Sequence, residues 1–220
     1  SAREVTFWGP FDAQGRPLAP PHRTGLSQTY DSRPLGSERY VQRLELPEPG
    51  TYTVYWRVAS DIASHLEPTL WETSEYLYWR GHKRLFDGLC YGILLALLIY
   101  NLALTAVFKD RTYGLYVLSC GFALLTLATF NGHTAHYLWP EHPWWIEHSY
   151  TLFPALWLSC NALFARHFLN TRALAPRLDW VILGLLWIAC LGLGFSVTGQ
   201  ASWAQRVNEA VSFAGVWLIT

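Results

Sequence analysis

Two long stretches without a charged side chain constrain this chain more than any other feature. Residues 88–108 contain no Asp, Glu, Lys or Arg, and after Lys109-Asp110-Arg111 there is none in residues 112–139. At 1.5 Å per residue, a helix of about 21 residues can cross the ~30 Å hydrocarbon core of a bilayer. The two stretches therefore predict a transmembrane helical hairpin in a membrane protein.

The distribution of charge divides the chain into two parts. There are 16 basic and 16 acidic side chains, and twenty of these lie in residues 1–85. We therefore expect a polar domain followed by a membrane-embedded domain over residues 86–220. Zero net charge and the lack of a basic stripe argue against a nucleic-acid partner. Because the chain lacks methionine and stops inside an apolar run, we expect it to be a piece of a longer protein.

The polar domain has the pattern of β-structure. Residues 51–59 alternate between two faces, as a half-buried strand does. We expect Pro47-Glu48-Pro49-Gly50 to turn the chain, so that residues 39–46 and 51–59 form an antiparallel hairpin. So few strands cannot close a sandwich, and residues 1–72 are interpreted as the C-terminal part of an incomplete antiparallel β-sandwich. The expected strands are 3–8, 39–46, 51–59 and 66–72.

The apolar runs predict an α-helical transmembrane bundle preceded by a connector over residues 73–85. Pro154 is expected to kink its helix, and Asn101 and Asn161 are expected to bond between helices. The five helices are placed at about 86–108, 113–137, 146–168, 178–198 and 204–220.

Basic residues in short loops predict the orientation. Lys109 and Arg111 in one loop, and Arg166, Arg172 and Arg177 near another, place these loops in the cytoplasm and the β domain outside.

Three basic residues before the first helix, Arg80, Lys83 and Arg84, oppose this count. We expect them to bind lipid phosphates, with Trp79, Trp139, Trp144 and Trp145 as anchors at the membrane interface. Since the segment 72–84 joins the β domain to the first helix, any signal is expected to pass through it. A flexible linker after Trp79 is therefore predicted to abolish the response.

Few residues suggest chemistry. His133 and His136 share a helical face and are the candidate metal or haem ligands, although hydrogen bonding between helices is the favoured interpretation. Tyr55, Trp56 and Trp79 are the candidates for an aromatic platform that binds a ligand. Core packing is the favoured interpretation for Trp56, and anchoring at the membrane interface is the favoured one for Trp79. The four cysteines lie in apolar runs without metal-ligand spacing, and there is no catalytic motif. We therefore expect no enzyme activity, no cofactor and no metal.

Five segments together follow a recognisable pattern: TYTVYWRVAS, DGLCYGILLALLIYN, KDRTYGLYVL, NGHTAHYLWP and LFARHFLNTR. They resemble the bacterial seven-transmembrane receptors with diverse intracellular signalling modules. Within them Gly132 and the Tyr91-Gly92 and Tyr100-Asn101 pairs are pattern positions, for which the resemblance implies structural roles.

The resemblance implies a jelly-roll sensor domain in the periplasm and five of seven helices in the bacterial inner membrane. It implies a carbohydrate or other small ligand, and a cytoplasmic diguanylate cyclase or histidine kinase outside this chain, through which two copies could pair. The alternative is a transporter or a cofactor-binding membrane subunit with a site at His133 and His136. A cofactor subunit does not need the β domain, and the chain lacks the intramembrane acid–base residues of a proton-coupled transporter.

Overall fold

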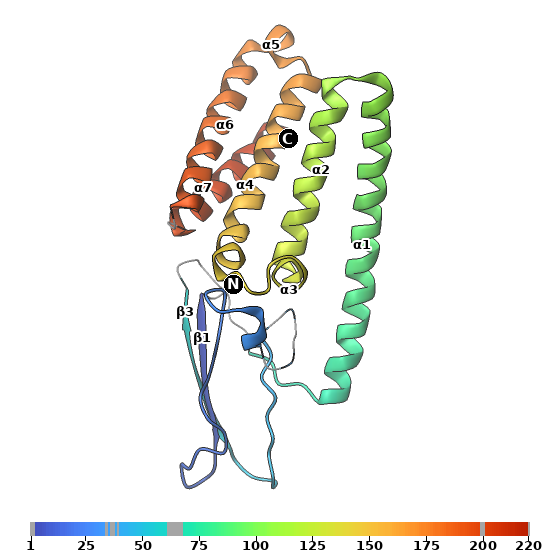
Figure 1. The fold of residues 1–220 in the computed structure, drawn as a ribbon. Coiled ribbons are helices and arrows are strands. Elements are labelled where there is room, and N and C mark those ends of the chain that lie inside the picture. Colours follow the sequence, from blue (N-terminus) through green and yellow to red (C-terminus); the bar gives the residue numbers. More distant parts are fainter. Residues whose placement is uncertain are drawn as a thin grey trace.

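A small sheet lies against one end of a bundle of helices (Figure 1). The computed structural model describes residues 3–33, 35, 38, 40–60, 68–198 and 201–219. The sheet is antiparallel, with three strands in the order β2-β1-β3. The polar domain followed by membrane helices is therefore confirmed.

The central strand of the sheet is β1 (Glu4–Phe11), which pairs with β2 (His22–Thr24) and β3 (Thr53–Ala59). Phe7 of β1 lies opposite His22 on one side and Trp56 on the other. Both longer strands are rich in β-branched and aromatic residues, which fit a pleated surface.

The predicted hairpin between residues 39–46 and 51–59 is wrong. Residues 40–46 and 68–72 form no strand, while Arg39 and residues 61–67 lie outside the described part of the chain. β3 pairs with β1, some fifty residues earlier in the sequence. Alternation shows that a segment can form a strand, but not which partner it takes.

The bundle is built from long helices joined by short turns (Figure 1). Three helical stretches are apolar and long enough to cross a membrane: Thr73–Phe108, Arg111–Phe130 and Pro176–Ser196. The helices are α1 (Thr73–Phe108), α2 (Arg111–Phe130), α3 (His133–Tyr137), α4 (Pro143–Phe168), α5 (Thr171–Leu174), α6 (Pro176–Val197) and α7 (Ala201–Ile219). Helices α4 and α7 occupy the other two expected spans.

Two helix boundaries differ from the prediction. The connector 73–85 is helical and continuous with the first membrane helix, so α1 has 36 residues. It extends past the end of the other helices (Figure 1). The second helix ends at Phe130 rather than near Tyr137, because Gly132 has φ 81° and starts the separate helix α3.

The polar residues within the helices also differ from expectation. Asn101 and Asn161 do not bond between helices, since each amide donates to the carbonyl four residues earlier, of Leu97 and Trp157. A hydrogen bond between helices is found near Pro154 of α4. The side-chain amide nitrogen of Asn208 on α7 donates to the Thr151 carbonyl oxygen of α4 at 2.9 Å.

Candidate functional site

The N-terminal domain docks on the bundle through a small apolar core. Leu26 and Tyr30 from the N-terminal domain are buried with Ala135 of α3 and Ile146 of α4. The backbone N–H of Tyr30 donates to the carbonyl of Pro140 at 2.9 Å, between α3 and α4. The two parts therefore share a packed interface.

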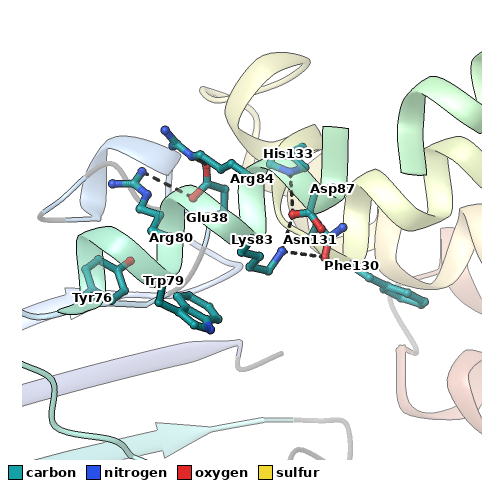
Figure 2. Close-up of a pocket in the computed structure, with 10 residues that line it drawn as sticks. All are labelled: Glu38, Tyr76, Trp79, Arg80, Lys83, Arg84, Asp87, Phe130, Asn131 and His133. Carbon is teal, nitrogen blue, oxygen red and sulfur yellow. Dashed lines mark hydrogen bonds and ion pairs between the residues drawn. The ribbon is translucent and has the colours of Figure 1, made fainter. Parts of the chain in front are cut away.

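Beside this core, Glu38 of the N-terminal domain holds the outer part of α1 (Figure 2). Its Oε1 accepts from Arg84 Nη2 at 2.6 Å and Nε at 3.2 Å, and its Oε2 lies 3.5 Å from Arg80 Nη2. The Glu38 side chain is only 12% exposed. Two arginines of α1 therefore form charge-assisted contacts with one carboxylate of the domain.

The charge of Glu38 is favoured by these partners. Burial raises the pKa of the Glu38 carboxyl, but its backbone hydrogen bond together with Arg84 and Arg80 holds that pKa below the ordinary 4.5. Docking therefore gains stability from this group above pH 4.5, and loses it as the pH falls through the lowered pKa.

The backbone of Glu38 passes close to Gly132. A Cβ atom at Gly132 would lie 2.6 Å from the Glu38 carbonyl oxygen, closer than real Cβ contacts allow. The φ of 81° is itself a conformation that glycine adopts at little cost. Glycine at this position therefore permits both the turn into α3 and the close approach of Glu38.

A second network ties α1 to the turn between α2 and α3. Asp87 is 8% exposed and accepts from Lys83 one helical turn earlier, while His133 Nε2 lies 3.6 Å from its Oδ2. Lys83 also donates to Asn131 Oδ1 at 3.4 Å. The Asn131 amide nitrogen donates to the Tyr91 hydroxyl at 2.9 Å.

The two networks change the interpretation of the three basic residues before the first helix. Arg80 and Arg84 face Glu38, and Lys83 faces Asp87, so these three cations form ion pairs within the chain, while their binding of lipid phosphates stays a prediction. Paired cations offer less net charge to the membrane potential and to anionic lipid. This explains how three basic residues can precede α1 on the side that the two loops assign to the outside.

The space between the networks is small. A cavity of about 70 Å³ is lined by residues of both networks, together with the aromatic side chains of Tyr76 and Trp79 (Figure 2). That volume admits a few water molecules and is well below that of an ordinary small-molecule site. The space between the two networks is therefore too small for an ordinary small-molecule ligand.

The two candidate histidines have different surroundings. His133 faces Asp87 and the Tyr91 ring, whose centroid is 5.5 Å away. His136 stacks on Tyr30 of the N-terminal domain, with the ring centroids 4.5 Å apart. Among the described residues there is no group of three His, Cys, Asp or Glu side chains that could hold a metal ion. His136 thus packs at the docking interface, a position that its sequence spacing did not suggest.

The candidate aromatic platform is not assembled. Tyr55 and Trp56 are neighbours on β3 and point to opposite faces of the sheet, and they are 59% and 44% exposed. The core position favoured for Trp56 is therefore wrong. Trp79 instead packs beside Trp71 and Tyr76 at the start of α1, with ring centroids 5.8 Å and 6.2 Å away.

The remaining expected anchors divide into two kinds. Trp144 and Trp145 are 47% and 40% exposed at the start of α4, where membrane anchoring stays a prediction. Trp139 packs against the docking core and stacks with Phe153, so it is a packing residue.

Sequence reasoning missed Glu38 and Asp87, the two acids that organise the site. Asp87 could have been found, because Lys83 and Asp87 are four residues apart at the edge of an apolar run. No local sequence pattern identifies Glu38, because its partner Arg84 lies 46 residues later in the chain.

Comparisons with known proteins agree with this architecture. The 7TM diverse intracellular signalling family matches residues 83–220, and the 7TMR-DISM extracellular 2 domain matches residues 11–72. Both are domains of the receptor and sensor type rather than catalytic ones. No curated protein and no solved structure matches the chain. Because the first match covers more than half of the sequence, the chain belongs to the 7TM diverse intracellular signalling family, with an extracellular domain before its membrane helices.

Proposed function

We propose that this chain is the sensing and transmembrane part of a bacterial signalling receptor. A jelly-roll domain in the periplasm binds a small, carbohydrate-like ligand, and the helices lie in the inner membrane. The signal reaches a cytoplasmic output module outside these 220 residues, such as a diguanylate cyclase or histidine kinase, through which two copies pair. Membership of a receptor family supports this proposal, while the ligand and output rest on the resemblance.

One observation carries the proposed transmission. Glu38 of the extracellular domain pairs with Arg80 and Arg84 on α1, and α1 continues without a break to Phe108 at the far side of the bundle. A displacement of the domain therefore acts directly on a helix long enough to cross the membrane.

The same observation corrects the predicted effect of a linker. The extracellular domain contacts α1 beyond Trp79, at Arg80 and Arg84, and contacts α3 and α4 as well. A flexible linker after Trp79 leaves these contacts in place. It therefore interrupts the covalent path from β3 and leaves the contacts of the domain with α1, α3 and α4, so we propose that part of the response survives the linker.

The proposal is tested by comparing a variant that carries a flexible linker with a variant that also lacks the ion pairs of Glu38. The chain is placed in nanodiscs, its four cysteines are replaced by alanine, and spin labels are attached at Lys109 and Arg172. A panel of monosaccharides and disaccharides is first screened by calorimetry, and each binder is then tested for a change in label distance. In the parent chain we expect the sugar to change the distance between the labels. With a Gly-Ser linker after Trp79 we expect a smaller change in that distance, and with the linker combined with Glu38→Ala we expect none.

The matched control for Glu38→Ala is Glu45→Ala, an exposed acid of the same domain. A sugar that binds without changing the label distance in the parent chain contradicts the receptor proposal. An unchanged response in the combined variant contradicts only the path through Glu38.

The orientation has its own test. In intact cells, a cysteine at Glu48 or His142 is expected to react with a membrane-impermeant thiol reagent, while one at Asp110 or Arg172 is shielded. Detergent should make all four positions reactive, which controls for local burial. The opposite pattern would show that the domain lies in the cytoplasm.

A further inference from the structure

Arg33 is a buried cation in the extracellular domain, next to the docking core. The residue is 5% exposed, and its guanidinium carbon lies 4.8 Å from the Tyr30 ring centroid and 4.9 Å from that of Tyr40. A guanidinium between two aromatic faces is held by cation–π attraction, which is stronger where water is excluded. Burial raises the pKa of the Tyr40 hydroxyl far above its usual value, so this wall of the cage stays neutral.

The two walls of this cage come from different parts of the domain. Tyr30 belongs to the short helix η1 (Tyr30–Ser32), which bonds to the bundle through Pro140 and stacks on His136. Tyr40 begins the segment that leads into β3, the strand that carries Tyr55 and Trp56. Arg33 therefore lies where the sheet, η1 and the bundle meet.

Arg33 also fixes the backbone at the coupling residue. Its Nη1 donates to the Glu38 carbonyl oxygen at 2.7 Å. That same oxygen is the atom that a Cβ added at Gly132 would approach most closely, and the Glu38 carboxylate pairs with Arg80 and Arg84. The position of the Arg33 side chain thus determines where the Glu38 backbone sits on the bundle, and so whether its carboxylate reaches α1.

We propose that Arg33 is the positioning residue of the coupling site: held between Tyr30 and Tyr40, it sets the docked position of Glu38. A shift of Tyr40 with β3 then moves Arg33 and releases Glu38 from Arg84. This deepens the proposed function by naming how the site is regulated, and it rests on that function only for the source of the movement.

The test measures docking directly and needs neither ligand nor output. Spin labels are attached at Arg57 on β3 and Lys109 at the far end of the bundle, in nanodiscs and without native cysteines. We expect Arg33→Met to raise the fraction of undocked distances about tenfold. Arg33→Lys keeps the charge but loses the planar fork, so a smaller increase is expected.

A double-mutant comparison separates positioning from general destabilisation. If Arg33 acts through Glu38, then Arg33→Met adds little undocking once Arg84→Gln is present. The control is Arg3→Gln, which weakens the pair between Arg3 and Glu147 at the same interface, and its effect should add to that of Arg33→Met. Additive effects with Arg84→Gln would overturn the proposal.

A variant of the cage covers the case in which Arg33→Met fails to fold. Tyr40→Leu removes one wall and leaves Arg33 in place, and Tyr40→Phe keeps the ring as a conservative rescue. We expect undocking with leucine and parental distances with phenylalanine. Parental docking in both Tyr40→Leu and Arg33→Lys would overturn the proposal, whether or not a sugar ever changes the inner distance between Lys109 and Arg172.

Discussion

Gly132→Ala is expected to release the extracellular domain from the bundle. A non-glycine residue in the left-handed region costs about 1–2 kcal/mol, which by itself weakens docking roughly tenfold. The new methyl group would also lie 2.6 Å from the Glu38 carbonyl oxygen, so the Glu38 backbone must move away. The label distance between Arg57 and Lys109 should therefore become broad and long, and the larger Gly132→Val should undock completely.

Two other glycines provide the control for this substitution. Gly88→Ala and Gly92→Ala place the same methyl group on α1, where nothing lies within 4 Å of the added atom. Both variants should keep the parental distance distribution. A docked Gly132→Ala variant would show that Glu38 does not need its close approach to the turn before α3.

The largest loss of stability is expected from Asp179→Ala, at the other end of the bundle. Asp179 is 7% exposed and accepts from Arg166 at 2.6 Å and 3.1 Å, and from the Thr171 hydroxyl at 2.8 Å. Removing one partner of an ion pair that is largely shielded from water destabilises the fold, because the other charge stays uncompensated. The Thr171 hydroxyl also loses its acceptor.

Thermal unfolding in detergent measures this effect. The midpoint of the Asp179→Ala variant should fall clearly below that of the parent chain. Arg177→Gln, which removes an exposed charge beside the same turn, should leave it unchanged. Exchanging the charges, with Arg166→Asp and Asp179→Arg together, should restore part of the loss. An unchanged midpoint in Asp179→Ala would mean that water, rather than Asp179, compensates Arg166.

Features that depend on composition over many residues, such as the membrane helices, were predicted from the sequence alone. A run of 21 uncharged positions in a helix can only lie in lipid or in a large core, so the membrane helices followed from residues 88–108 and 112–139. The strand over Thr53–Ala59 also followed, because alternation is a local property.

Two predictions failed for different reasons. The helix was expected to continue through Gly132 because no charge interrupts the run, although glycine is itself a local stop signal and takes φ 81° here. The choice of β1 as the partner of β3 is a long-range choice. That choice cannot be derived from a window of neighbouring residues.

The candidate site was the least predictable part of the chain. Arg80, Lys83 and Arg84 were identified as unusual because they oppose the positive-inside rule. Their partners could not be named, since a lipid phosphate and a carboxylate satisfy an arginine equally well in sequence terms. The departure of these three residues from the positive-inside rule could have indicated that acidic residues of the same chain lie nearby.

The length of α1 gives the helix the properties of a lever. Its 36 residues span about 54 Å, far more than the hydrocarbon core, and the contact of Asp87 with His133 of α3 can serve as its fulcrum. The arm outside, from Thr73 to Asp87, is about 21 Å long, and the arm inside, from Asp87 to Phe108, about 32 Å. A sideways push of about 1 Å at Thr73 therefore appears at Phe108 as a displacement of about 1.5 Å in the opposite direction.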